Sequence, residues 1–332
     1  MSQYKYFLKP VGEDCLNDAV RLAMDEYHVE QKNVRTLYNK DYSTEIKNSL
    51  SELFNNGKCL MLYENDVPAG FLGVIISDKT DSEGYKTAWG PICDYGIKTC
   101  DDRGRIASLL FQYLSELLLP LNVRHYTINI YAHDKEVIQS FVLNQFSIMA
   151  INEIADINVP FIKEKINGIT FQEFSKSNIQ EHKVTLLRMW RDLASHLRES
   201  PTYYYGAEFT EDAYWQYVND RNTRLFVAMD NAQQIIGIIN THHDGFSFAT
   251  SDALTLNASN LYVEPAYRGK RIAQGLLQYV SDVLKKENYK RLWVMHGTGN
   301  PNALRFWSKY FTGYIYQLTR SIDKKVVSFH RS

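Results

Sequence analysis

The pattern of apolar and polar positions predicts an amphipathic helix near residues 271–284. Apolar residues repeat there at the spacing of one helix face, and polar residues fall on the opposite face. The apolar positions are Ile272, Leu276, Leu277, Val280 and Leu284, and the polar ones are Gln274, Ser281, Lys285 and Lys286. An apolar run ending at Val263 precedes the helix, and another follows it. The segment therefore predicts a strand, a charged loop, a helix and a second strand, in that order.

The same pattern occurs once before in the chain. Residues 105–118 read RIASLLFQYLSELL and residues 271–284 read RIAQGLLQYVSDVL, an offset of 166 positions (105 to 271). The offset continues from Asn122 to Asn288 and into the apolar run that follows. A register held across a helix and its neighbours indicates an internal duplication.

The repeat predicts two homologous domains, residues 1–158 and 167–332. Residues 158–168 contain a proline, charged residues and a glycine, which is typical of a linker. A short strand and two helices are expected first in each domain, at 6–9, 16–27 and 44–55, and again at 169–174, 179–197 and 210–219. Several strands and then a long helix follow in both. This order favours a mixed sheet with helices on both faces, in the α/β (α+β) class.

Composition narrows the class of protein. The 37 Lys and Arg residues balance 38 Asp and Glu residues, which argues against a nucleic-acid-binding role because such proteins carry a basic excess. No stretch approaches the roughly 20 apolar residues of a membrane helix, and the first residues lack the apolar core of a secretory signal. We therefore expect a cytoplasmic protein that does not associate with membranes.

The cysteines indicate no special chemistry. Cys15, Cys59, Cys93 and Cys100 are unevenly spaced, and no two are separated by only two residues. This spacing predicts neither a zinc site nor a redox pair. We expect small buried apolar residues in a reducing compartment, and no metal.

The loop Arg268-Gly269-Lys270-Arg271 is the most informative segment. It places three cations in four residues directly before a helix. Backbone N–H groups and the positive end of the helix dipole make such a helix start an anion site that suits a pyrophosphate. The loop alone is equally compatible with a solvated basic turn, because one glycine is weak evidence for phosphate binding.

The residues around this loop resemble the acyl-CoA-binding signature of the GNAT superfamily of N-acyltransferases. The family pattern is a strand, then Val-x-Pro-x-x-Arg-Gly-x-Gly-x-Ala/Gly, then a helix, and it is matched at Val263, Pro265, Arg268, Gly269 and Ala273. Arg271 stands where the family usually has glycine, which an ordinary helical φ would tolerate. The resemblance implies acetyl-CoA as acyl donor, bound by Leu261, Tyr262, Val263, Arg268, Gly269, Lys270, Arg271, Ile272 and Ala273. The order of elements implies two tandem GNAT-like domains, each a mixed, mostly antiparallel sheet flanked by helices.

A second segment resembles the family pattern Asn-x-x-Ala-x-x-Leu-Tyr. Asn300 and Ala303 match it, and Trp307 stands at the tyrosine position. The resemblance implies that these three residues contact the pantetheine arm of the cofactor. Asn300 is also a natural helix cap before Pro301, and the two roles are compatible. Trp307 cannot give up a proton as a tyrosine would, so the acid would be another residue or water.

The first half departs from this signature. Its loop, Asp101-Asp102-Arg103-Gly104, is one residue shorter before the helix and carries two carboxylates where an anion would approach. Its later segment places Lys135 opposite Asn300. We expect a degenerate domain that binds no cofactor, and the alternative is a second active site.

Acyl transfer to an amine needs a group that takes the amine proton. His296 is the candidate base, because it ends the strand that the resemblance directs at the thioester. A purely structural histidine is the alternative there. His242 is a weaker candidate, and because adjacent residues on a strand point to opposite faces, His242 and His243 do not predict a shared metal ion.

Tyr203, Tyr204 and Tyr205 lie between the two early helices of the second half, where the resembled fold has its acceptor site. Tyrosine rings suit an amine or a cation, and packing of this loop on the first domain is the alternative. We therefore expect an acetyl-CoA-dependent N-acetyltransferase that acts on a primary amine of a small molecule or peptide, by direct transfer in the C-terminal domain. A non-catalytic acyl-CoA-binding or interaction protein on the same fold is the other possibility. We expect a monomer or a homodimer.

Overall fold

The computed structural model describes residues 6–204 and 209–329. Tyr205 of the predicted acceptor loop lies outside the described residues. The chain divides into two compact units. The first unit comprises Met1–Ile151 and Gly313–Ser332, and the second unit comprises Asn152–Thr312.

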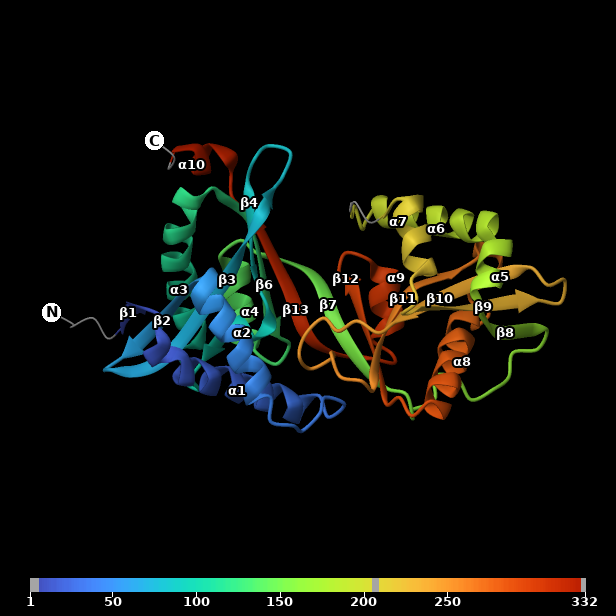
Figure 1. The fold of residues 1–332 in the computed structure, drawn as a ribbon, viewed down its shortest axis with the longest axis horizontal. Coiled ribbons are helices and arrows are strands. Elements are labelled where there is room, and N and C mark those ends of the chain that lie inside the picture. The colour runs from blue at the N-terminus through green and yellow to red at the C-terminus, as the bar shows by residue number, and fades with distance from the viewer. Residues whose placement is uncertain (1–5, 205–208, 330–332) are drawn as a thin grey trace. The chain divides into compact units, whose positions relative to one another are not determined.

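The first unit is a mixed sheet with helices packed against it (Figure 1). Its strands are β1 (Tyr6–Pro10), β2 (Lys58–Glu64), β3 (Val67–Thr80), β4 (Lys86–Gly90), β5 (Tyr95–Ile97), β6 (Val123–Tyr131) and β13 (Thr312–Ser321). Its helices are α1 (Leu16–Asn33), α2 (Ser43–Asn56), α3 (Arg103–Leu118), α4 (Lys135–Leu143) and α10 (Lys324–Phe329), with 3-10 turns at Glu13–Cys15, Ile92–Asp94 and Leu119–Leu121. The strand order is β1-β2-β3-β4-β6-β13, and β5 pairs with β3. β4 and β6 run parallel, whereas the β1–β2, β2–β3, β3–β4 and β6–β13 pairs are antiparallel.

The second unit repeats this arrangement. Its strands are β8 (Ile169–Phe174), β9 (Thr223–Asp230), β10 (Ile235–His242), β11 (Thr255–Val263) and β12 (Arg291–Gly297). Its helices are α5 (Lys176–Glu181), α6 (Lys183–Arg198), α7 (Glu211–Asn219), α8 (Ile272–Lys286) and α9 (Pro301–Trp307), with a 3-10 turn at Pro265–Tyr267. The strand order is β12-β11-β10-β9-β8, and β7 (Ser147–Asp156) lies beside β12. Only the β11–β12 pair among the pairs from β8 to β12 is parallel. The predicted mixed sheet flanked by helices is therefore confirmed.

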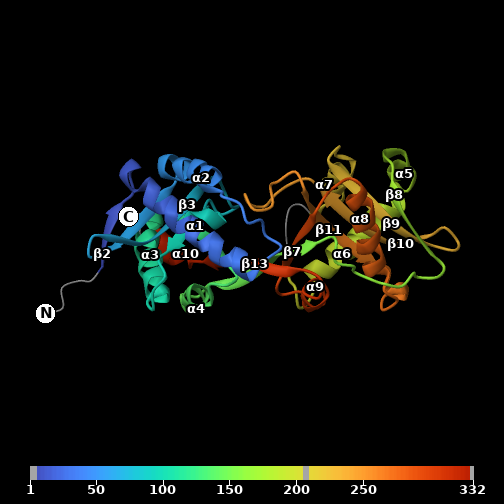
Figure 2. The same cartoon turned by 90° about the horizontal axis from the view of Figure 1, so that it is seen from below.

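Two apolar cores cover the two faces of the second sheet. One core joins α8 and α9 to alternate strand residues such as Phe226, Ala258 and Leu292. The other joins α6 and α7 to the intervening residues, such as Leu225 and Val227. Figures 1 and 2 show α8 on one side of this sheet and α6 and α7 on the other. The alternation follows from the two-residue period of a strand.

The last strand of the chain belongs to the first unit. β13 pairs with β6 from Ile315 opposite Tyr131 to Ser321 opposite His125. β7 begins in the first unit, and residues 152–156 at its end belong to the second. The division thus differs from the expected domains at 1–158 and 167–332. The repeat gives each half a final strand of its own, and the sequence carries no signal for which sheet that strand joins.

The expected linker is part of the second unit. Phe161 lies buried in the core on the α8 face, and its backbone N–H donates to Gln278 Oε1 at 2.9 Å. Ser281 Oγ donates to the carbonyl of Ile157 at 2.7 Å. Within residues 6–204 and 209–329, none of the helices has both the length and the apolar character that crossing a membrane requires.

Candidate functional site

Strands β11 and β12 separate after a short parallel ladder. The ladder joins residues 255–257 to residues 291–293. In the described register no further pair links the two strands, although β11 continues to Val263 and β12 to Gly297. Strands that part in this way leave backbone N–H and C=O groups available inside a sheet. This opening is the centre of the candidate site.

A β-bulge lies in β11 beside the opening. Ser259 pairs with Asn240 and Tyr262 pairs with Ile238, so β11 has one residue more than β10 over this stretch. Asn260 takes up the bulge with a φ of 52°, a left-handed conformation that asparagine tolerates better than most residues. Bulges re-aim the chain next to active sites. Residues 260 and 261 therefore leave the regular ladder where the strands begin to part.

The start of α8, where the sequence predicts an anion site, has backbone N–H groups without partners inside the helix. The first hydrogen bond at its start is donated by Gly275 N to Arg271 O at 3.0 Å. The N–H groups of Ile272, Ala273 and Gln274 precede that bond and point out of the helix start. Gly269 has a φ of 78°, and a Cβ there would meet nothing within 4 Å. The loop backbone is thus open to an approaching anion.

Aromatic rings hold the cations of this loop. Arg268 lies with its guanidinium 5.7 Å from the Tyr262 ring, and its Nε donates to the carbonyl of Val263 at 3.0 Å. Lys270 lies 4.9 Å from the Tyr267 ring. Both cations remain exposed. They supply positive charge beside the free N–H groups without being neutralised by a carboxylate in the described contacts.

Arg271 differs from the expectation of an ordinary helical φ. Its φ is 63°, in the left-handed region, because it is the cap residue where the loop turns into α8. This conformation explains why glycine suits the position. The Arg271 side chain pairs with Glu164 at 2.8 Å, and both side chains are largely exposed.

The strand residues of the expected cofactor set point in two directions. Leu261 and Val263 pack against the core on the α8 face. Tyr262 is buried in the core on the α6 and α7 face. Burial raises the pKa of its phenol to about 12, so the hydroxyl stays protonated. Its hydroxyl lies 3.5 Å from Glu264, which is paired with Arg188.

Asn300 and Trp307 lie at the two ends of α9. Asn300 caps the helix, with its Oδ1 accepting from Ala303 N at 3.1 Å. Trp307 is only 6% exposed and packs edge-on against Phe311 at 5.2 Å in the α8-face core. The predicted capping role of Asn300 is confirmed, and Trp307 is a core residue whatever else it contacts.

His296 lies inside the second unit. Its Nε2 is 3.1 Å from Glu153 Oε2, its Nδ1 is 3.4 Å from the carbonyl of Gly297, and both side chains of the pair are buried. Ser308 Oγ donates to the other oxygen of Glu153 at 2.8 Å. Both ring nitrogens of His296 thus face oxygen atoms of the second unit. Sequence reasoning missed Glu153, because nothing local connects it to a histidine 143 positions away.

His242 lies on the face of the second sheet that α6 and α7 cover. It is half-buried, its ring centroid is 5.6 Å from that of Tyr217, and its Nε2 is 3.6 Å from Asp220 Oδ1. His243 follows the end of β10 and is exposed. Among the described residues, these two histidines form no group that could hold a metal ion.

The tyrosine loop lies beside the connection between β12 and α9. A Cβ on Gly299 would lie 3.7 Å from the carbonyl oxygen of Thr202. Tyr203 is 73% exposed, and Tyr204 packs edge-on against Phe209 at 5.4 Å. The loop therefore borders the open end of β12, and Tyr203 is available for contact.

The corresponding position of the first unit is filled by its own side chains. Gly104 N, at the start of α3, donates to Glu136 Oε1 at 2.9 Å, so a carboxylate stands where an anion would bind. Arg103 turns inward to the carbonyls of Ile97 and Lys98. The buried hydroxyl of Tyr95 accepts from Tyr131 N at 3.1 Å, between β5 and β6.

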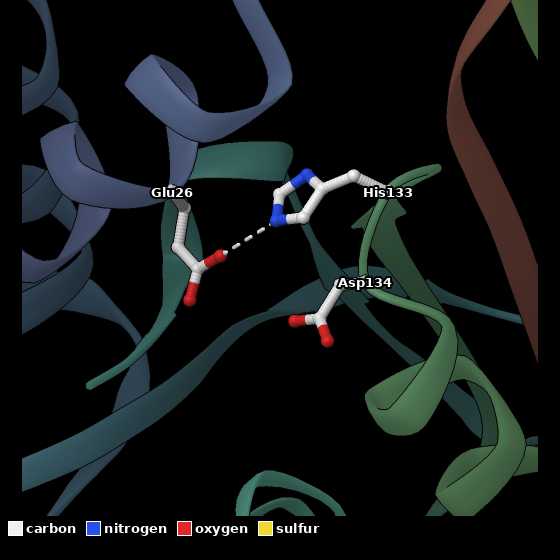
Figure 3. Close-up of side chains that lie close together, drawn as sticks. All are labelled: Glu26, His133 and Asp134. Atoms are coloured by element: carbon white, nitrogen blue, oxygen red, sulfur yellow. Dashed lines mark ion pairs between the residues drawn. The ribbon is translucent and has the colours of Figure 1, made fainter. Parts of the chain in front are cut away.

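Arg103 also ends in a buried cluster of charges, of which Figure 3 shows Glu26, His133 and Asp134. Its Nη2 pairs with Glu26 at 2.7 Å and with Asp134. His133 Nδ1 lies 2.6 Å from Glu30, and its Nε2 is 3.4 Å from Glu26. Ligand atoms of Glu26, His133 and Asp134 lie within 4.8 Å of one another, a spacing compatible with a metal ion. The guanidinium of Arg103 already supplies the cation to both carboxylates.

The cap residues correct one expected correspondence. Asp134 caps α4 by accepting from Val137 N, as Asn300 caps α9 by accepting from Ala303 N. The offset of the repeat thus stays at 166 (134 to 300), and Asp134, not Lys135, matches Asn300. The cap of the first unit is thus acidic where that of the second unit is an amide, and Arg103 pairs with the acidic cap.

The comparisons with known proteins bear on the class. Residues 190–312 match the acetyltransferase (GNAT) family. A GCN5-related N-acetyltransferase from Sphaerobacter thermophilus has a similar structure, with a TM-score of 0.57 and 12% identity over 97% of each chain. A glucosamine N-acetyltransferase region of a fungal β-N-acetylglucosaminidase is similar over 96% of this chain and 38% of that chain, with a TM-score of 0.52 and 13% identity. No curated protein matches the sequence. At these identities the two structures support the fold alone.

Proposed function

We propose that the second unit transfers an acetyl group from acetyl-CoA to a primary amine of a small molecule or peptide. The observation that carries this proposal is the open start of α8, directly downstream of a strand that parts from its neighbour. The first feature suits a pyrophosphate and the second suits an extended chain that ends in a thioester. The match of residues 190–312 to the acetyltransferase (GNAT) family supports acyl transfer as the reaction class.

The donor would be held mainly by backbone groups. The N–H groups of residues 269–274 and the cations Arg268 and Lys270 would bind the pyrophosphate. The pantetheine arm would lie in the opening, bordered by Asn300 and Ala303 at the start of α9. Residues 260 and 261, turned out by the bulge, would lie beside the thioester carbonyl, where backbone N–H groups stabilise developing negative charge.

The acceptor would approach from the α6 and α7 face. Tyr203 and Tyr204 would border its entry beside Gly299. His296 is fully engaged with Glu153 and Gly297, so we assign it to positioning the end of β12 and leave the base role to the face that carries His242.

The first unit would bind no acetyl-CoA. Glu136 caps the N–H that a phosphate would need, and Tyr95 bridges to β6 where a pantetheine arm would run. For the first unit to bind acetyl-CoA, the cofactor would have to displace both Glu136 and Tyr95.

Calorimetric titration with CoA tests donor binding. We expect one site per chain, and Arg268→Glu should weaken it about 10- to 150-fold, because a charged hydrogen bond contributes about 1.5–3 kcal/mol. Arg105→Glu makes the same charge change on the exposed start of α3 and should leave affinity unchanged. Two equal sites, or equal losses in both variants, would contradict the proposal.

Thiol release from acetyl-CoA with a panel of primary amines tests the reaction. Turnover with at least one amine is expected. Tight CoA binding with no turnover on any amine would instead establish the alternative, a non-catalytic acyl-CoA-binding protein.

A further inference from the structure

A row of polar residues interrupts the apolar core on the α6 and α7 face. Apolar residues fill this face along most of β9 and β10. Where the β11–β12 ladder ends and the opening begins, Asn240 of β10 stands opposite Ser259 of β11, and His242 stands opposite Asn257, which still pairs with Trp293. Polar residues packed between a sheet and a helix call for a reason, since apolar ones would be less costly there.

Two hydroxyl groups in this row are joined. Tyr217 of α7 and Ser259 of β11 share a hydrogen bond of 2.9 Å between their oxygens. Either hydroxyl can donate while accepting from a third group. Ser259 lies beyond the end of the β11–β12 ladder and one residue before the bulge at Asn260. The hydroxyl pair therefore connects the candidate reaction centre with the space under α7.

The groups around Tyr217 are mostly acidic or titratable. Asp220 and Asp244 act on it electrostatically, and burial raises the pKa of its phenol. It therefore remains protonated through neutral pH and acts as a hydroxyl. The imidazole of His242 lies against its ring, and Asp220 Oδ1 is 3.6 Å from His242 Nε2.

One buried oxygen in the row lacks a partner. Asn240 Oδ1 has no hydrogen-bond partner among the described residues, and Asn240 is fully buried. A buried polar group without a partner costs about 1–3 kcal/mol. Packing alone therefore leaves this oxygen of the row unsatisfied.

We propose that Ser259 and Tyr217 form a proton relay that carries the proton of the acceptor ammonium to His242. This inference rests on the proposed function. Ser259 Oγ accepts a proton from the amine nitrogen and passes its own proton to the Tyr217 oxygen. Tyr217 in turn releases its proton to the imidazole of His242 through one water molecule, so both hydroxyls end neutral.

The ammonium loses two protons in all. The first passes along the relay to His242, and the electron pair of the broken N–H bond forms the new N–C bond to the acyl carbon. As the C–S bond of the thioester breaks and its pair leaves with sulfur as a thiolate, the nitrogen of the adduct gives its second proton to solvent, and the thiolate takes a proton from solvent. Asp220 stabilises the charged imidazole of His242 until it returns the proton to water.

Tyr217→Phe tests the relay, with Tyr214→Phe as the matched control. Tyr214 lies one turn earlier on α7 and is buried. Its ring stacks on that of Trp190, with 4.5 Å between the two ring centroids. We expect Tyr217→Phe to lower kcat about 100-fold, within the range of general base catalysis, with KM for acetyl-CoA unchanged. Tyr214→Phe should keep the kcat of the unaltered enzyme.

The pH profile separates a relay from a structural role. His242 must be neutral to accept the proton, so kcat should rise with pH along one limb, and His242→Gln should remove that limb. Ser259→Thr should retain activity and Ser259→Ala should lose it. If Tyr217→Phe keeps both kcat and the limb while the unaltered enzyme acetylates amines, the relay is wrong and the proposed function stands. If the unaltered enzyme acetylates no amine, both are wrong.

Discussion

Arg271 ends the basic loop with a φ of 63°, where a side chain other than glycine is strained. Such a conformation costs about 1–2 kcal/mol for a residue with a Cβ. The ion pair with Glu164 contributes little in return, because both side chains are largely exposed to solvent. The residue therefore carries a local cost next to the anion site.

Arg271→Gly should raise the free energy of unfolding by about 1 kcal/mol through relief of that strain. Arg105→Gly, the same change within helix α3, should lower it by about 1 kcal/mol, because glycine weakens a helix. Urea unfolding of both variants measures the two effects. A loss of stability in Arg271→Gly would show that the side chain contributes more than its backbone costs.

Single residues were also where sequence reasoning was weakest. Asn300 and its neighbours could be assigned as a cap because the cap motif is local. The φ of Arg271 depends on the turn between β11 and α8, and the partner of His296 lies on β7. Neither leaves a local pattern in the sequence.

At the scale of elements, a buried ion network connects four elements of the first unit. Glu26 and Glu30 come from α1, Arg103 from α3, and His133 and Asp134 from the turn between β6 and α4, while Ile97 N of β5 donates to Glu26. Burial lowers the pKa of His133, but hydrogen bonds to Glu26 and Glu30 outweigh it and raise that pKa to about 9. The histidine is therefore a cation in the folded protein at neutral pH.

This network predicts a loss of stability at high pH. The unfolded pKa of histidine is about 6.5, so the contribution of His133 is complete below that pH and disappears as pH rises through about 9. Between pH 6 and pH 9.5 the free energy of unfolding should fall by about 3 kcal/mol more in the unaltered protein than in His133→Gln. Urea unfolding at the two pH values measures the difference. Parallel pH dependence in both proteins would mean that His133 is neutral when folded.

The periodicity of the sequence predicted most helices and strands well, but it did not predict which strands pair. The strand expected at 169–174 is β8, and the helix expected from the 272–284 pattern is α8. The helix expected at 179–197 is instead two helices, α5 and α6, divided at His182. Alternation and helical spacing are properties of one segment, whereas a strand partner is chosen among all segments, so the place of β13 could not be read locally.

At the scale of the whole molecule, the boundaries of the two compact units differ from the boundaries of the two sequence repeats. The second unit takes residues 152–156 of β7 and gives up residues 313–332. The core on the α8 face includes Ala155, Ile157 and Phe161, all buried. The repeat boundary near residue 167 therefore cuts through the core of the second unit.

This arrangement predicts which fragment folds. Residues 167–332 lack Ile157 and Phe161, whose burial contributes about 3–6 kcal/mol, and they retain a β13 strand without its partner β6. That loss is comparable with the roughly 5–15 kcal/mol stability of a domain. Residues 152–312 keep the core and Glu153, and should melt cooperatively by circular dichroism as a monomer on size-exclusion chromatography. Fragment 167–332 should aggregate or show no cooperative melt. Equal melting temperatures for the two fragments would mean that the first strand of this core is dispensable and that β13 is not tied to β6.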